Sequence, residues 1–337
     1  MSGISAKIAS VISALVIAAT IAVAGAITFA GSGLLMDAAV KRLGHSAQIA
    51  GMPLSAMLKA VSQDTEFLTH TKAVERIVQA DGEAERGTGE LGWKDDLADI
   101  FSAMLESQPW YVRIRLLEMR TQPREVVRVE RVRGHIARTP GQGTPAASLR
   151  RYFEQSASLA GNDFYLSQID GHREQGRLRE PHTPSVSAAR PVYVETGKPF
   201  GLIIIDVDMG PVFAAARSLL DPESSLYVTN EQGAYVFHPD ATKIAGFDPA
   251  QRHRIQEEIP ETQPLLDGRL PQLVVPSLRA GFAGSSVGYF ERVPLAVDGS
   301  ERFLVLGVST PRDSVLEHVD EIRKRGAGYT FLFAFNN

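Results

Sequence analysis

Two arginines and a tyrosine alternate with apolar residues in the stretch from Trp110 to Glu118 (WYVRIRLLE). Successive side chains of a strand point to opposite faces, so Tyr111, Arg113 and Arg115 are predicted to share one face. Guanidinium groups bind carboxylates through two parallel hydrogen bonds, and this pattern therefore predicts a site for a small anionic ligand. The alternative is a solvated sheet face, on which the ten arginines between residues 113 and 151 are partly neutralised by Glu118, Glu125 and Glu130.

Further polar residues on neighbouring predicted strands could complete such a pocket. Tyr165 and Ser167 would share a face of a later strand and offer hydroxyl contacts. Asp170 and Asp206 could each pair with a ligand ammonium group or with a neighbouring arginine, and for Asp206 the arginine is preferred. A few converging polar groups in a mostly apolar cavity are typical of a small-molecule site.

One string fits a catalytic pattern, the G-x-S-x-G of Gly284 to Gly288. That motif requires a strand, a sharp turn and then a helix, whereas here the string leads into a predicted strand and no helix follows. The eight histidines lack the spacing of metal ligands, and the chain contains no Gly-rich phosphate loop. The sequence therefore predicts no enzyme, no metal site and no cofactor.

Composition narrows the classes of function further. The net charge of −4 gives no basic field for nucleic acid. The absence of cysteine excludes disulfides, thiol catalysis and thiolate metal sites. The length of 337 residues allows one large or two ordinary domains.

The first apolar run, Ile8 to Ala30, contains 23 residues and no charge. As a helix it would span roughly 34 Å, enough to cross the apolar core of a bilayer. Lys7 precedes the run, so we expect the N-terminus in the cytoplasm and the rest of the chain outside a bacterial inner membrane. The alternative is a signal peptide cleaved after small residues such as Ala24 or Ala26.

The periodicity of apolar residues then switches between helix and strand. One long helix is predicted from Gly33 to Ala80, bent at Pro53, and a loop from Asp81 to Gly92. Two hairpins are expected, and the run from Leu202 to Val207 should lie in the middle of a sheet. The other predicted elements are helices 93–107, 149–160, 212–220 and 311–325, and strands 110–118, 125–133, 162–169, 186–195, 200–209, 225–229, 234–238, 272–275, 287–293 and 303–309. The apolar end, residues 326–337, is interpreted as the start of a second membrane segment.

In order and spacing these stretches resemble the double Cache family, the tandem PAS-like sensor domains of bacterial transmembrane receptors. WYVRIRLLE and EVVRVE resemble a sheet hairpin of that family, with Tyr111, Arg115 and Arg128 at its recurrent positions. FYLSQID with ARPVYVETGKPFGLIIIDVDM resembles the closing strands of the membrane-distal module, and LYVTNEQGAYVFHPD the opening hairpin of the membrane-proximal one. Where many members carry an arginine this chain has Ser187, and Arg190 follows three residues later.

The resemblance implies an α+β fold in which a long N-terminal helix carries two PAS-like modules, each an antiparallel sheet flanked by helices. The expected parts are an anchor (1–31), a stalk (32–92), a distal module (93–209), a proximal module (210–310) and a C-terminal helix with the start of a membrane segment (311–337). The expected function is extracytoplasmic sensing of a small anionic or amino-acid-like molecule by a receptor of the sensor kinase, diguanylate cyclase or chemoreceptor type. The long helix could form a homodimer. The alternatives are a released periplasmic solute-binding module and, with less support, an anchored hydrolase.

Overall fold

The computed structural model describes residues 40–82, 88–119, 123–139, 164–171, 173–174, 177–178, 183–244, 253–278, 286–295, 302–312 and 314. The predicted anchor at Ile8–Ala30, the helix at 149–160 and the apolar C-terminal segment lie outside these residues. Within the described residues, no helix combines the length and the apolar character needed to cross a membrane. The chain divides into two compact units, of which the larger comprises Ser46–Leu273 and Phe290–Val308.

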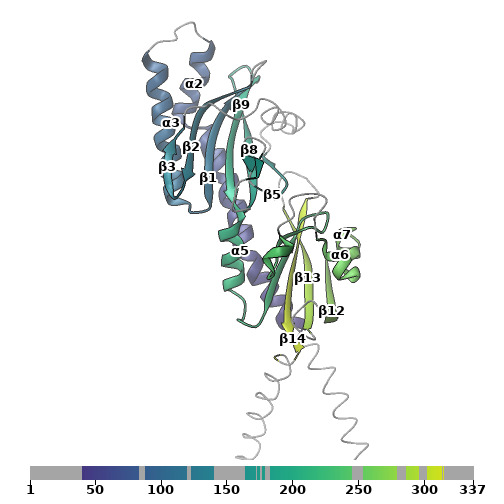
Figure 1. The fold of residues 1–337 in the computed structure, drawn as a ribbon. Helices are drawn as coiled ribbons and strands as arrows, with labels where there is room; N and C mark the ends of the chain where they lie inside the picture. Colours follow the sequence, from purple (N-terminus) through teal and green to yellow (C-terminus); the bar gives the residue numbers. More distant parts are fainter. Residues whose placement is uncertain are drawn as a thin grey trace, which may run out of the picture. The chain divides into compact units, whose positions relative to one another are not determined.

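The fold is α+β with two antiparallel sheets, as predicted. The first sheet has seven strands in the order β3-β2-β1-β9-β8-β4, with β5 paired to β8 (Figure 1). Its strands are β1 (Tyr111–Glu118), β2 (Arg124–Val132), β3 (His135–Arg138), β4 (Tyr165–Leu166), β5 (Asp170–Gly171), β8 (Pro184–Tyr193) and β9 (Pro199–Asp208). The apolar strand β9 lies between β1 and β8, which confirms the interior position predicted for Leu202 to Val207.

The N-terminal helix is described over residues 40–69, and α2 (Lys72–Gly82) and α3 (Thr88–Ser107) follow it. The helix continues through Pro53, as predicted, but it breaks at residues 70–71, so the single helix predicted to reach Ala80 is two helices. There the Thr71 hydroxyl donates to the Leu68 carbonyl and accepts from the Val74 amide, so this side chain ends one helix and caps the next. The predicted loop at 81–92 is shorter than expected, since α3 already begins at Thr88.

Helix α3 packs against β1, β2 and β3, and α2 packs against α3. The apolar residues that β1 and β9 turn to this side, such as Ile114, Leu116 and Ile205, are fully buried. The helices and one face of the first sheet therefore form a common apolar core.

The second sheet has five strands in the order β11-β10-β14-β13-β12. They are β10 (Ser225–Thr229), β11 (Tyr235–Phe237), β12 (Gln272–Leu278), β13 (Ser286–Pro294) and β14 (Phe303–Pro311), close to the predicted ranges. Helix α5 (Met209–Ser218) begins directly after β9, and the Asp208 side chain caps it by accepting the Gly210 amide. Between β11 and β12 lie α6 (Ile255–Glu258) and α7 (Gln263–Leu266).

Two parts of the sequence interpretation need correction. Strand β3 was not predicted, because four residues that follow the tight turn at Arg133 and Gly134 give too short a pattern. Pro311 was expected to be the first residue of a helix, but it is the last residue of strand β14.

Close approach of two strands at Gly201 makes this glycine a test of the β1–β9 pairing. A Cβ atom at Gly201 would lie 1.8 Å from the Leu117 carbonyl oxygen, so Gly201→Ala must push the strands apart. We expect it to lower the free energy of unfolding by about 1–3 kcal/mol, measured by chemical denaturation. Gly51→Ala is the control, because Gly51 is helical with no atom within 4 Å of its added Cβ, and it should raise stability by about 0.5–1 kcal/mol. Equal effects of the two substitutions would contradict the pairing.

Candidate functional site

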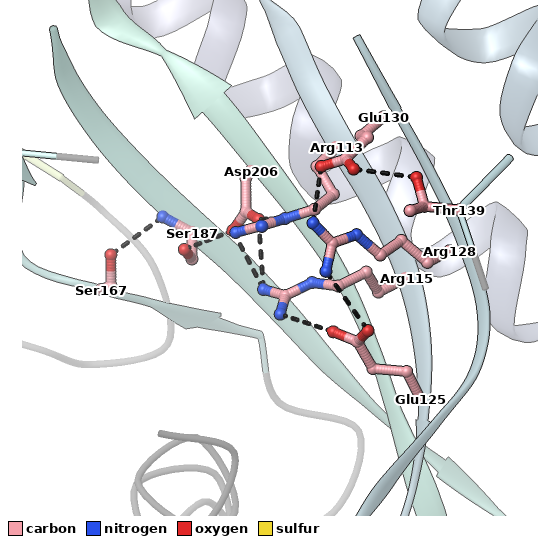
Figure 2. Close-up of polar contacts among 9 residues, drawn as sticks. All are labelled: Arg113, Arg115, Glu125, Arg128, Glu130, Thr139, Ser167, Ser187 and Asp206. Atoms are coloured by element: carbon pink, nitrogen blue, oxygen red, sulfur yellow. Dashed lines mark hydrogen bonds and ion pairs between the residues drawn. The ribbon is translucent and has the colours of Figure 1, made fainter. Parts of the chain in front are cut away.

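Three arginines and three acidic residues converge on one face of the first sheet, and we call this group the charge cluster (Figure 2). It consists of Arg113 and Arg115 from β1, Glu125, Arg128 and Glu130 from β2, and Asp206 from β9. The strand register explains the convergence, because Arg113 lies opposite Glu130 on one neighbouring strand and opposite Asp206 on the other. Cross-strand neighbours on one face are within reach of each other.

Asp206 is the point at which the two β1 arginines meet. Its carboxylate accepts from Arg113 Nε at 2.7 Å and from Arg115 Nη2 at 3.1 Å. The Ser187 hydroxyl on β8 donates to the other oxygen, Oδ1, at 2.5 Å. Asp206 is only 2% exposed, so these bonds replace the water that a carboxylate would otherwise bind.

The two glutamates connect Arg128 to the rest of the cluster. Glu125 accepts from Arg115 Nη1 at 3.3 Å and contacts Arg128 Nη1 at 3.5 Å. Glu130 accepts from Arg128 Nη2 at 2.7 Å and from the Thr139 hydroxyl at 2.8 Å. The six charged groups thus form one continuous network.

The charge cluster is neutral in its formal charges, since three guanidinium groups face three carboxylates. All three arginines are nearly buried, with exposures of 7%, 1% and 8% for Arg113, Arg115 and Arg128. A buried charge without a partner is strongly destabilising, which is why the signs must balance here. The cluster therefore presents no net positive charge to a ligand.

The Glu130 carboxylate shows how the cluster fixes protonation states. Burial by itself would raise the pKa of Glu130, but the hydrogen bonds from Arg128 and Thr139 and the charges of Arg128 and Arg113 together hold it below its ordinary value. The acid is therefore ionised at neutral pH and serves as a fixed acceptor.

A buried apolar group adjoins the charge cluster on the same sheet. Ile204 lies opposite Arg115, and Leu202 lies opposite Leu117. Ile204, Leu202 and Leu117 form a buried apolar group with Ala189. The half-buried side chain of Tyr165 packs against this group. A charged region beside an apolar region is what a small molecule with both characters requires.

Tyr111 does not share a face with the arginines, contrary to the prediction. The pairing of β1 with β9 is irregular between Tyr111 and Arg113, where one residue is left over. Such a bulge reverses the alternation of side chains. The Tyr111 hydroxyl instead donates to Asp64 of the N-terminal helix at 2.6 Å. Burial and this bonded carboxylate raise the pKa of Tyr111, which keeps the phenol neutral.

Arg190 also lies apart from the charge cluster. It pairs in register with Ile203, whereas the cluster uses the alternate residues of β8 and β9. Its guanidinium group lies 3.4 Å from the Ser62 hydroxyl and 3.9 Å from the Glu66 carboxylate, both on the N-terminal helix. The group thus connects the helix to the sheet.

Of the remaining predicted residues, Ser167 lies beside the cluster rather than within it. The Ser167 hydroxyl accepts the Ser187 amide at 2.9 Å and donates to the Gln168 carbonyl at 2.9 Å. Asp170 pairs through its main chain with Ser185, and its side chain lies outside the described part of the chain.

The sequence interpretation named Glu125 and Glu130 only in its alternative, as acids that neutralise a solvated sheet face, and it did not connect Thr139 or Ser187 with the arginines. The place of Glu130 in the cluster follows from the pattern, because it alternates with Arg128 on a strand predicted to pair with β1. Thr139 follows β3, which was not predicted, and Ser187 had been noted only as a departure from the expected arginine.

No group of three potential metal ligands occurs among the described residues. In the G-x-S-x-G string, Ser286 is buried and begins strand β13, so a strand stands where the catalytic motif needs a helix.

A family model described as bacterial histidine kinase, sensor domain, matches residues 88–267, which is just over half of the chain. The comparison with curated proteins finds no match.

Several solved structures share the fold. A domain assigned to a sensory box/GGDEF family protein from Vibrio parahaemolyticus is 17% identical with a TM-score of 0.67, covering 83% of this chain and 99% of that one. An extracellular domain assigned to the histidine kinase vpHK1S-Z8 has the same identity and TM-score, with 85% and 96% covered. The ligand-binding domain of the Campylobacter jejuni chemoreceptor Tlp3, in complex with L-valine, is 7% identical with a TM-score of 0.55, covering 84% and 96%.

Acidification should act on the cluster through Glu130. Because its pKa is lowered in the folded protein, Glu130 contributes stability above its unfolded pKa of about 4.3, and this contribution is lost as the pH falls through the folded pKa. Glu130→Gln should therefore cost about 1–3 kcal/mol at pH 7 and show a smaller loss of stability between pH 5 and pH 3. Denaturant titrations at each pH measure both effects.

The control for this prediction is Glu106→Gln, which removes the same charge from an exposed position of α3. It should leave the dependence of stability on pH close to that of the unchanged protein. A pH profile of Glu130→Gln that parallels the unchanged protein would contradict the assigned role of Glu130.

Proposed function

Because the chain belongs to the family of bacterial histidine kinase sensor domains, we propose that it is the extracytoplasmic sensing region of a membrane-anchored receptor. Residues 8–30 would form the anchor, and the bulk of the chain would lie in the periplasm. The first sheet would bind a small molecule at the charge cluster and the buried apolar group beside it. The observation that carries this proposal is the neutral charge cluster adjoining apolar side chains on one sheet face.

The charge balance supports a zwitterionic, amino-acid-like ligand over a simple anion. A lone anion would leave one unpaired negative charge in a buried site, which costs free energy. A ligand with a carboxylate and an ammonium group can exchange partners with Arg115 and Asp206 without disturbing the balance. Its side chain would lie on the apolar group around Leu202 and Ile204. The complex of the similarly folded Tlp3 domain with L-valine agrees with this ligand class.

The opposite face of the same sheet offers a route from the ligand to the membrane. Tyr111 and Arg190 bond this face to Asp64 and Ser62 of the N-terminal helix. A ligand that binds one arrangement of the sheet more tightly would shift the population of helix positions toward that arrangement. The helix would carry the shift toward the anchor, alone or in a homodimer.

A thermal-shift screen of the full chain, purified in mild detergent, tests the proposal with amino acids, dicarboxylates, polyamines and purines as probes. A ligand at 100 times its Kd adds about 2.7 kcal/mol to stability. We expect a rise in Tm with at least one amino acid. No shift across the panel would contradict a small-molecule site of this type.

A matched pair of substitutions locates the site. Arg115→Lys keeps the charge but loses the planar fork, so it should abolish the shift given by the amino acid. Arg190→Lys makes the same change on the opposite face of the sheet and should leave the shift unchanged. A shift that survives at full size in Arg115→Lys would exclude the charge cluster as the binding site.

A further inference from the structure

A continuous series of hydrogen bonds leads from Asp206 in the charge cluster to a turn of the second sheet. Every residue of this series lies in the larger compact unit, which comprises Ser46–Leu273 and Phe290–Val308. The series contains Asp206, Ser187, Ser167, Arg302 and Glu231. Of these five residues, only Asp206 belongs to the charge cluster.

The first half of the series joins the cluster to the edge of the first sheet. The Ser187 hydroxyl donates to Asp206 at 2.5 Å, and the Ser187 amide donates to the Ser167 hydroxyl oxygen at 2.9 Å. In return the Ser167 amide donates to the Ser187 carbonyl at 2.8 Å. Figure 2 shows these side chains in a row extending from Asp206. The position of Ser167 is therefore fixed by a residue that itself holds Asp206.

The second half depends on the guanidinium group of Arg302, which precedes β14. Arg302 Nη1 donates to the Ser167 carbonyl at 2.7 Å and also to the Leu166 carbonyl. Arg302 Nε donates to Glu231 at 2.7 Å. One planar side chain thus holds main-chain atoms next to β4 and a carboxylate next to β10 at a fixed separation.

Glu231 belongs to the turn that joins β10 to β11. Asn230 organises this turn, because its side-chain oxygen accepts the amides of Gln232 and Ala234 and its carbonyl accepts the amide of Gly233. Gly233 has a φ of 79°, a value that favours glycine. A turn with one defined geometry transmits a displacement of Glu231 to both strands that it joins.

We propose that this series, with Arg302 as its central connector, transmits the state of the charge cluster to the β10–β11 turn. The inference rests on the proposed function in one respect, the event that starts the transmission. A ligand ammonium group bound to Asp206 would compete with the Ser187 hydroxyl for the carboxylate. Ser187 and Ser167 are then positioning residues and make no contact with the ligand. Arg302 carries the change across to Glu231.

Hydrogen–deuterium exchange of the full chain tests the proposal without any ligand. Ser187→Ala removes the bond to Asp206 and should raise exchange of the amides at residues 230–234 by about threefold or more, as expected for residues coupled in one network. Arg302→Gln should produce a similar rise. The double variant should show no further increase, because both changes interrupt the same series.

Two control variants separate transmission from general loss of stability. Ser102→Ala removes a hydroxyl that donates only within helix α3, to the Ala98 carbonyl. Arg217→Gln removes a guanidinium group bonded to the Asp221 and Pro222 carbonyls. Neither should selectively alter exchange at 230–234. Exchange in Ser187→Ala that matches Ser102→Ala, or full additivity with Arg302→Gln, would overturn the proposal.

The outcome of the hydrogen–deuterium exchange experiment does not depend on the outcome of the ligand screen. Coupled exchange without any ligand in the panel would support the transmission path and contradict the small-molecule site. A ligand that binds at the cluster, without coupled exchange, would support the site and overturn the path.

Discussion

The pairing of Asp206 with Arg113 and Arg115 is the interaction on which the first sheet depends. Two guanidinium groups on neighbouring positions of one strand face would repel each other in a buried environment, and one carboxylate on the adjacent strand compensates both. The same need for compensation explains why Glu125 and Glu130 accompany Arg128. The register of β1 between β2 and β9 is therefore specified by charge on one face and by apolar packing on the other.

Most of the architecture could be predicted from the periodicity of apolar residues, but its irregular points could not. Alternation of apolar and polar residues identified β1 and β2, and the continuous apolar run from Leu202 to Ile205 identified β9 as an interior strand. The bulge next to Tyr111 could not be predicted, since it arises from pairing with a strand almost a hundred residues away. It moved Tyr111 to the helix side and so separated it from the arginines with which the alternation had grouped it.

The sequence predicted several residues of the candidate site but not its net charge. Arg113, Arg115, Arg128 and Asp206 do come together, and the preferred pairing of Asp206 with an arginine is observed. The observed balance matches the alternative, in which Glu125 and Glu130 neutralise the arginines, although the face is buried rather than solvated. Sequence spacing reports which side chains share a strand face, whereas the net charge of a site depends on which strands become neighbours.

The contact of Arg302 with β4 has a consequence for solubility as well. Among the described strands, β4 is the last on its side of the first sheet, and an edge strand offers main-chain groups to which another polypeptide can add. The guanidinium group of Arg302 already bonds the carbonyls of Leu166 and Ser167. A charged side chain on these acceptors makes them less available to an incoming strand, so the same residue disfavours edge-to-edge aggregation there.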